Sequence, residues 1–244
     1  MNIAKQLKVI TTLEDWFLHA PPKKGMAHWK DGRSAKELGR YWLEDEAARR
    51  LKGVLAPVFG DVLLLSAEPE CEISFDRFGG PRNCDLVLQA ECSRGPLTIH
   101  IEAKADETFN QIVGKYLEKM SKKKSDLPER ADRLSRALFG HSLDERVRRL
   151  RYQLLVGAAA TRSDAATRGA VAAVCLIQEF RSAGLSDRKL KANHEDWESF
   201  LKMFPELEAK DVSASDKLFG PVAAPEGAAV GTPLYFAKLI VNLS

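Results

Sequence analysis

Three ionisable residues lie at the ends of two apolar sequence runs, where a hydrophobic core would not account for them. Asp85 opens the run DLVLQAEC, and Glu102 and Lys104 end the run LTIHIEAK. Both runs alternate between apolar and polar residues over most of their length, which is typical of half-buried β-strands. Two carboxylates with a lysine beside them can bind a divalent cation and a phosphate group.

The connection Ser-Arg-Gly-Pro between the two runs predicts a β-hairpin. If Arg94 and Gly95 form a two-residue turn, Asp85 pairs with Lys104. Because side chains alternate along a strand, one face of this hairpin would be apolar. That face would carry Leu86, Leu88, Ala90, Ile99, Ile101 and Ala103. The other face would gather Asp85, Glu102 and Lys104 at one end.

Two carboxylates held a few ångströms apart repel each other unless a cation lies between them or one is protonated. A pair of oxygen ligands suits Mg²⁺, with Mn²⁺ as the alternative. Lys104 could then orient the attacking water or stabilise charge on a phosphate. A surface sheet face with Lys104 in a salt bridge to Asp85 or Glu102 explains the same spacing without a metal. Spacing alone leaves both interpretations open.

The elements expected around these runs form a mixed α/β (α+β) domain. A helix over 34–55 is predicted to begin with Ser34 and Glu37 as a capping box. The remaining expected elements are strands at 61–75, 84–92 and 97–104, helices at 107–122, 128–139 and 143–162, a strand at 170–180, a helix at 194–204, a loop at 211–233 and a terminal strand after it.

The composition fits one globular domain spanning 1–244, with 45% hydrophobic and 29% charged residues. A net charge of +3 says little about partners, although 119–151 is rich in Lys and Arg, including 122–124. The four cysteines lack a metal-binding spacing, which favours reduced thiols in the core. We find neither a secretion signal nor an apolar run long enough for a membrane span, so we expect a cytoplasmic protein without a membrane partner.

Asp85, followed by Glu102-Ala103-Lys104 at a strand end, resembles the motif of the PD-(D/E)xK nuclease superfamily, which includes restriction endonucleases and λ-exonuclease-like nucleases. The element order over about 34–180 is similar to the family core of a helix, a three-stranded meander, a helix and a further strand. A proline often directly precedes the aspartate of the family, whereas Pro81 lies four residues ahead here. The resemblance implies a restriction-endonuclease-like fold, with 181–244 as a C-terminal elaboration.

The resemblance also implies a function. It predicts a metal-dependent nuclease that hydrolyses phosphodiester bonds of DNA in defence or repair, with a homodimer where both strands are cut. Asp85, Glu102 and the backbone carbonyl of Ala103 would hold Mg²⁺. Lys104 would position the attacking water and stabilise the phosphate.

Further residues are implied by the same resemblance. Many family members add a carboxylate from the first helix, and Glu44, on a predicted inward stripe with Leu51, is the candidate, with Glu37 as the alternative. Arg151 and Gln153, in RYQLL, are expected to meet a phosphate or the catalytic lysine. Arg151 also fits a solvated basic helix face.

Two other functional classes compete with the nuclease. One is a non-catalytic nucleic-acid-binding or assembly module that retains the nuclease fold. The other is an unrelated α/β protein whose polar sheet face is only a salt-bridged surface. The presence of Asp85, Glu102 and Lys104 together favours the enzyme, because a descendant without activity usually loses one of them.

Overall fold

The computed structural model describes residues 1–78, 80–121, 125–182 and 186–243. The basic run at 122–124, and with it the predicted end of the helix over 107–122, lies outside these residues. Among the described residues, no helix combines the length and the apolar composition that crossing a lipid bilayer requires.

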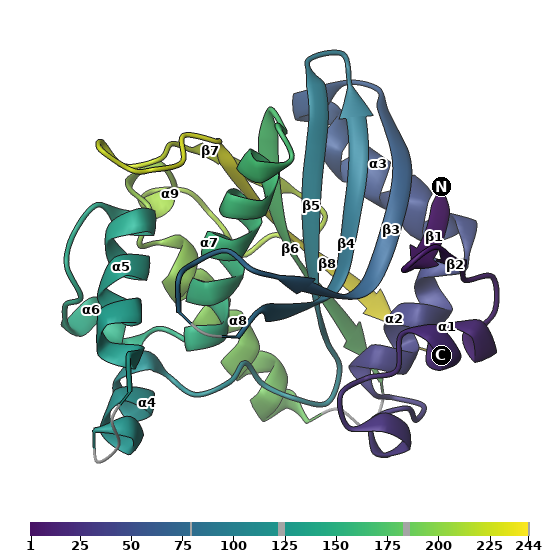
Figure 1. Cartoon of the computed structure of the whole chain (residues 1–244), viewed down its shortest axis with the longest axis horizontal. Coiled ribbons are helices and arrows are strands. Elements are labelled where there is room, and N and C mark those ends of the chain that lie inside the picture. The colour runs from purple at the N-terminus through teal and green to yellow at the C-terminus, as the bar shows by residue number, and fades with distance from the viewer. Residues whose placement is uncertain (79, 122–124, 183–185, 244) are drawn as a thin grey trace.

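A single mixed sheet of eight strands runs through the structure in the order β2-β1-β3-β4-β5-β6-β8-β7 (Figure 1). The strands are β1 (Asn2–Lys5), β2 (Lys8–Val9), β3 (Val62–Ile73), β4 (Arg82–Cys92), β5 (Gly95–Lys104), β6 (Ala172–Arg181), β7 (Leu218–Val222) and β8 (Leu234–Asn242). The strands β3, β4 and β5 form an antiparallel meander, whereas β5, β6 and β8 are parallel. The prediction of a mixed α/β (α+β) fold is confirmed.

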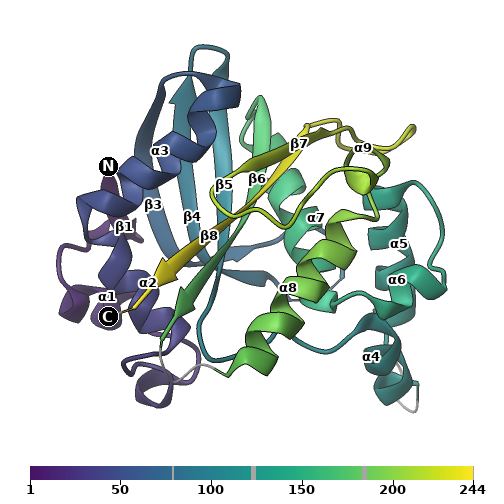
Figure 2. The same ribbon diagram turned by 180° about the vertical axis from the view of Figure 1, so that it is seen from behind.

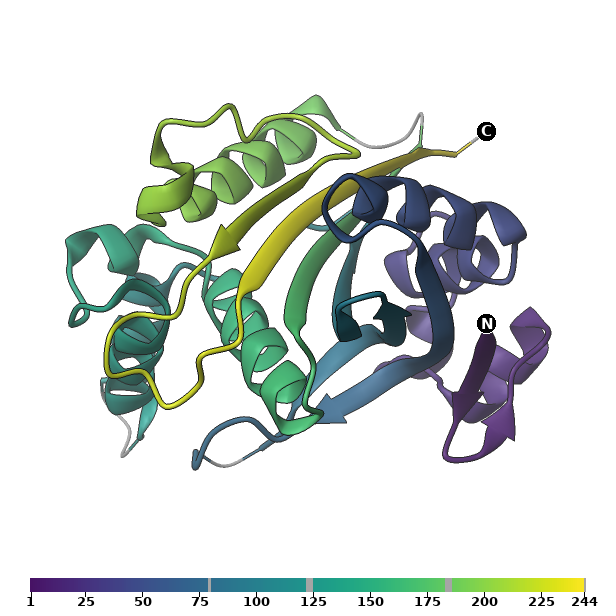
Figure 3. The ribbon, with the colours of Figure 1, turned by 90° about the horizontal axis from the view of Figure 1, so that it is seen from above.

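Helices cover both faces of this sheet, which Figures 2 and 3 show from behind and from above. The helices are α1 (Leu13–His19), α2 (Ser34–Trp42), α3 (Asp45–Phe59), α4 (Val113–Met120), α5 (Leu127–Phe139), α6 (Glu145–Arg149), α7 (Tyr152–Thr167), α8 (Asp187–Leu201) and α9 (Pro205–Glu208). Apolar side chains of α1, α2 and α3 pack on one sheet face, and those of α5, α7 and α8 pack on the other.

The structure has two helices, α2 and α3, where one continuous helix over 34–55 was predicted, so the prediction of a single helix was wrong. Leu43 ends α2, and Glu44 has an extended backbone with φ −97° and ψ 144° before α3 begins. Asp45 and Glu46 then occupy the first turn of α3, where acidic side chains interact favourably with the helix dipole. The break allows the second helix to follow a different direction over the sheet.

The capping box predicted from Ser34 and Glu37 is also absent. The N-cap residue of α2 is Arg33, and it makes no capping hydrogen bond through its side chain. Glu37 is only 1% exposed and instead accepts hydrogen bonds from the Gly32 amide and the Arg40 guanidinium. A buried carboxylate held by these two donors has a structural role.

The helix predicted over 143–162 is interrupted as well. Between α6 and α7, Arg151 forms a β-bridge with Ile112, and the Tyr152 amide donates to the Gln111 carbonyl. These bonds replace helical ones and fix the segment after β5 against the start of α7. The predicted loop over 211–233 contains one short strand, β7, which pairs with β8.

Candidate functional site

The hairpin of β4 and β5 brings Asp85, Glu102 and Lys104 to one end of the sheet, but not in the predicted register. Cys92 pairs with Gly95 and Leu86 pairs with Ile101, so the turn residues are Ser93 and Arg94. The shift relative to the prediction is two residues, which preserves the face of each side chain. The six residues of the predicted apolar face are all buried in the cluster under α2 and α3.

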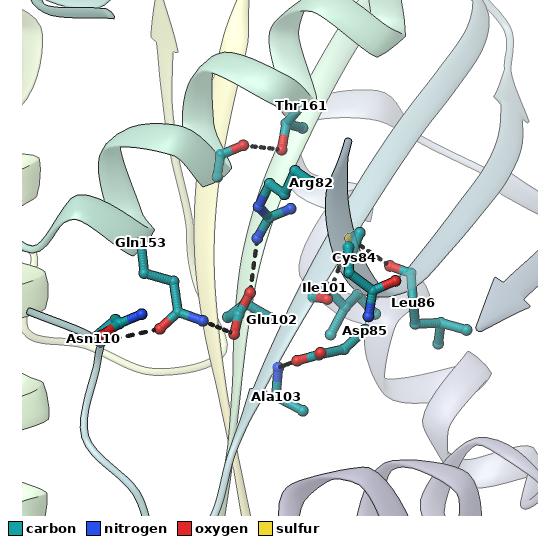
Figure 4. A network of polar contacts seen from close by, with 12 residues as sticks. Arg82, Cys84, Asp85, Leu86, Ile101, Glu102, Ala103, Asn110, Gln153 and Thr161 are labelled. Carbon is teal, nitrogen blue, oxygen red and sulfur yellow. Dashed lines mark hydrogen bonds and ion pairs between the residues drawn. The ribbon is translucent and has the colours of Figure 1, made fainter. Parts of the chain in front are cut away.

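The paired register ends at Leu86 and Ile101, and Asp85 lies just beyond it. There the Asp85 carboxylate accepts a hydrogen bond of 2.7 Å from the backbone amide of Ala103, as Figure 4 shows. A side chain therefore takes the place of a backbone acceptor, and it ties the start of β4 to the Glu102–Lys104 segment.

Glu102 is the centre of a buried polar network and is only 7% exposed. Its Oε1 atom accepts hydrogen bonds from Lys104 Nζ, at 2.7 Å, and from the amide of Gln153. Its Oε2 atom accepts from Arg82 Nη2, also at 2.7 Å. Figure 4 shows Arg82 and Gln153 approaching Glu102 from β4 and α7, respectively. Gln153, which was expected to meet a phosphate or Lys104, instead donates its hydrogen bond to Glu102.

The two carboxylates have different proton affinities because their surroundings differ. Burial and the charge of Glu102 raise the pKa of Asp85 well above its ordinary value. Burial also disfavours the charged form of Glu102, but Lys104 and Arg82 outweigh it and lower the pKa of Glu102. Glu102 is therefore an anion at neutral pH, and a second negative charge on Asp85 costs free energy in the absence of a further cation.

Lys104 is an ammonium group inside this network. It is 4% exposed, and its Nζ atom also donates to the Ala103 carbonyl at 3.2 Å. Burial alone would lower the pKa of Lys104, but the Glu102 and Asp85 carboxylates raise it. A protonated lysine cannot accept a proton from water, so its chemistry here is charge stabilisation and orientation.

The oxygen atoms at this site that could hold a divalent cation belong to Asp85, Glu102 and the Ala103 carbonyl. Oxygen donors of this kind match Mg²⁺ and Mn²⁺. Burial first, and then the charges of Glu102 and Glu70, raise the pKa of Asp85, and a bound cation would favour its charged form. In the described part of the chain, no group of three or more His, Cys, Asp or Glu side chains forms a metal cluster. The fit of this site to a divalent cation therefore depends on two carboxylates and one backbone carbonyl.

Two residues expected in the site lie elsewhere. Glu44 is exposed at the junction of α2 and α3, so the predicted inward stripe of a continuous helix was wrong. Arg151 directs its guanidinium to Asp196 of α8, at 2.7 Å, and to the Asn110 carbonyl, at 3.1 Å. Arg151 therefore holds α7 and α8 to the segment after β5, and the structure shows no contact between it and Glu102 or Lys104.

Sequence reasoning missed Arg82, because strict alternation along β4 places it on the apolar face with Leu86. The alternation is broken near Asp85. Cys84 and Val87 are three residues apart, yet both pack in a small cluster with Ala160 of α7. The break turns Arg82 toward Glu102. The residue opposite Asp85 on β3, Glu70, has a positive φ of 48°, and no sequence signal marked this irregularity.

Glu70 is a third carboxylate close to the site. Burial and the charge of Glu102 raise its pKa, and its own charge in turn raises the pKa of Asp85. Its side chain accepts a hydrogen bond from the Asn83 amide. This residue could have been found only from the pairing of β3 with β4, which the sequence did not specify.

Comparisons with known proteins give one result. Neither the curated proteins nor the solved structures contain a match to this chain. One family model, described as a domain of unknown function (DUF6946), matches residues 9–239, which contain the sheet except β1, the first residue of β2 and the last three residues of β8. The chain therefore belongs to the DUF6946 family of domains of unknown function.

Proposed function

We propose that this protein is a metal-dependent nuclease that hydrolyses phosphodiester bonds in DNA. The observation that supports the proposal is the hydrogen-bonded set formed by Asp85, Ala103, Glu102 and Lys104 at adjoining strand ends. The antiparallel meander β3–β4–β5, followed by helices and by β6 parallel to β5, is the order expected of a restriction-endonuclease-like core. Fold likeness alone does not establish an activity, so the argument rests on the site.

The residues of the site have separate roles in this proposal. Mg²⁺ or Mn²⁺, held by Asp85, Glu102 and the Ala103 carbonyl, would supply Lewis-acid stabilisation of the phosphate charge. Lys104, kept protonated by its carboxylate neighbours, orients the attacking water and stabilises charge on the scissile phosphate. Arg82 and Gln153 hold the Glu102 carboxylate in position by hydrogen bonds to its two oxygens.

The test is cleavage of single-stranded and duplex DNA, and of RNA, with Mg²⁺ or Mn²⁺. Wild type should cleave DNA, and Lys104→Met should lower the rate by about a hundredfold or more, since transition-state charge stabilisation is lost. Lys52→Met, on the exposed side of α3, is the matched control and should cleave normally. Circular dichroism must show that the Lys104 variant is folded. A folded, active Lys104→Met protein would exclude the proposed role of this lysine.

A second candidate is favoured by one specific observation, namely that both oxygens of Glu102 are already paired with cationic side chains. Such a neutralised network could belong to a non-catalytic nucleic-acid-binding module. Metal binding separates the two candidates. In calorimetry with Mn²⁺, the nuclease should bind metal through Asp85 and lose this binding in Asp85→Asn. DNA binding without cleavage, unaffected by Asp85→Asn or by metal, would support the module.

A further inference from the structure

A cleft of about 610 Å³ lies apart from the Asp85–Glu102 network, between α5, the outer side of α7 and two loops. One loop, Phe75–Phe78, connects β3 to β4, and Figure 1 shows this connection reaching across α7 toward α5. The other loop is 226–230, before β8. The cleft volume falls in the range typical of pockets for small organic ligands.

The lining of this cleft is strongly basic. It contains Arg77, Arg130, Arg133, Arg136 and Arg162, against the two acidic residues Asp76 and Glu226. Four of the arginines form salt bridges with carboxylates of neighbouring residues, namely Asp76, Glu129 and Asp132. With these partners counted, the five arginines stand against four carboxylates, so four of the arginines are already paired and Arg162 is left.

Arg162 of α7 differs from the other four. It is only 4% exposed, and no described carboxylate lies within salt-bridge distance of it. Its Nη atoms donate to the carbonyls of Ala137, Val222 and Ala223, while its Nε atom is buried without a hydrogen-bond partner. Burial lowers the pKa of Arg162 to about 10, and the charge of Glu206, which accepts a hydrogen bond from the Ala223 amide, only partly offsets this effect.

A buried guanidinium with neutral partners only is costly, and the cost falls when an anion is bound nearby. Apolar residues next to it, Phe75, Leu134 and Leu138, give the cleft a hydrophobic part. Arg130 stacks over the Phe75 ring at 5.2 Å, which keeps a flat surface on this wall. The cleft thus combines an unneutralised cation, a basic rim and apolar walls.

We propose that this cleft binds a phosphorylated small molecule of mononucleotide size, with its phosphate directed to Arg162 and the basic rim and its planar part against the apolar wall. Phosphate suits the site better than a carboxylate because several arginines can share its two negative charges. The proposal does not depend on the nuclease activity, because none of the residues Asp85, Glu102 and Lys104 lines this cleft.

The experiment is calorimetry of the full chain with AMP, CMP, GMP and UMP, with adenosine and inorganic phosphate as probes of the two halves of the ligand. EDTA is present, so that binding through a divalent cation does not contribute. At least one nucleotide should bind, and adenosine and phosphate should each bind more weakly. Arg162→Gln should weaken nucleotide binding by about tenfold or more, since a charge-assisted hydrogen bond is lost.

Two further variants keep the test decisive if Arg162→Gln does not fold. Arg136→Ala, whose side chain is 59% exposed on the rim, should weaken binding by about threefold without affecting folding. Arg49→Ala, 78% exposed on α3, is the control and should bind as wild type. The proposal is overturned if no nucleotide binds, if adenosine or phosphate binds as tightly as the nucleotides, or if Arg136→Ala and a folded Arg162→Gln both bind as wild type.

Discussion

At the scale of single residues, the candidate site is defined by the unequal surroundings of Asp85 and Glu102. Glu102 has two cationic neighbours, whereas Asp85 has one backbone amide and two nearby carboxylates, Glu70 and Glu102. Burial and then these carboxylates raise the pKa of Asp85 against the opposing charge of Lys104, whereas Lys104 and Arg82 outweigh burial and lower the pKa of Glu102. Residues that are placed to bind a metal are expected to destabilise the folded protein when the metal is removed. A substitution of Asp85 should make this destabilisation measurable.

This argument predicts that Asp85→Asn stabilises the metal-free protein at high pH. A raised pKa in the folded state means that stability is fully present below the ordinary aspartate pKa and is lost as pH rises through the folded-state pKa. Asparagine removes the charge and can keep the hydrogen bond from the Ala103 amide. In EDTA at pH 8 the variant should have the higher Tm, by about 2–4 °C for each 1 kcal/mol of repulsion relieved. The difference should shrink as pH falls toward about 4, near the ordinary aspartate pKa.

Thermal unfolding at several pH values, with and without Mg²⁺, measures this effect. Added Mg²⁺ should raise the Tm of wild type, since a ligand that binds only the folded state stabilises it, and should leave Asp85→Asn unchanged. Asp61→Asn, at an exposed aspartate, is the matched control and should show neither effect. A less stable Asp85→Asn protein at pH 8 in EDTA would show that repulsion between the carboxylates is not the dominant interaction of Asp85.

At the scale of elements, the hairpin shows what sequence reasoning could and could not determine. Alternating apolar residues predicted the apolar face of β4 and β5 from Leu86 to Ala103 correctly, because burial fixes which side chains point inward. The turn was misplaced by one residue, since Ser-Arg-Gly-Pro allows two adjacent turns of equal length. In the observed turn Gly95 lies against Val171, the residue before β6, and no local pattern contains this contact.

The same reasoning explains which site residues could be predicted. Glu102 and Lys104 lie on a regular strand, so the alternation of side chains was sufficient to place them together, whereas Gln153 was expected near the site only from the family resemblance. Arg82 lies beyond an irregularity of β4, where the period no longer applies. Glu44 was misplaced because the backbone leaves the helical conformation at this residue, and a helical pattern of apolar residues does not reveal such a break.

Gly95 begins β5 in a backbone conformation that favours glycine. Its φ is +124°, and an added Cβ would lie 2.9 Å from Val171 Cγ1. Gly95→Ala should therefore lower the free energy of unfolding by about 1–3 kcal/mol, through backbone strain and this contact. Adding Val171→Ala should recover only part of the loss, because it relieves the contact but not the strain. Urea denaturation measures both.

Gly53→Ala provides the control for this experiment. Gly53 lies within α3, and an added Cβ would meet nothing within 4 Å, so alanine should raise stability by about 1 kcal/mol. Complete recovery of Gly95→Ala by Val171→Ala would contradict the strain argument and leave only the steric one.

At the scale of the whole molecule, the two apolar clusters share strands that are far apart in the sequence. The C-terminal strand β8 lies between β6 and β7 in the sheet. Its side chains alternate between the clusters, with Tyr235, Ala237 and Leu239 on the side of α2 and α3, and Leu234 and Phe236 on the side of α7 and α8. The segment 181–244, which was expected from the sequence to be a C-terminal elaboration, therefore contributes an interior strand to the sheet.

We therefore predict that the segment 34–180 does not fold without the strands that follow it. Removing β8 exposes one edge of β6 and takes five buried apolar side chains out of the two clusters, of which Leu234, Phe236, Ala237 and Leu239 are all 0% exposed in the full chain. At about 1.5–3 kcal/mol for each large apolar side chain, this loss is comparable with the stability of a typical domain. Truncation after residue 233 should abolish the cooperative thermal transition seen by circular dichroism.

Deleting residues 1–9, which removes the two-strand edge β1–β2, should lower the Tm but keep the transition, because only Ile3 is buried there. A cooperative transition in the chain ending at 233 would instead show that β8 is dispensable and that the sheet is complete without it.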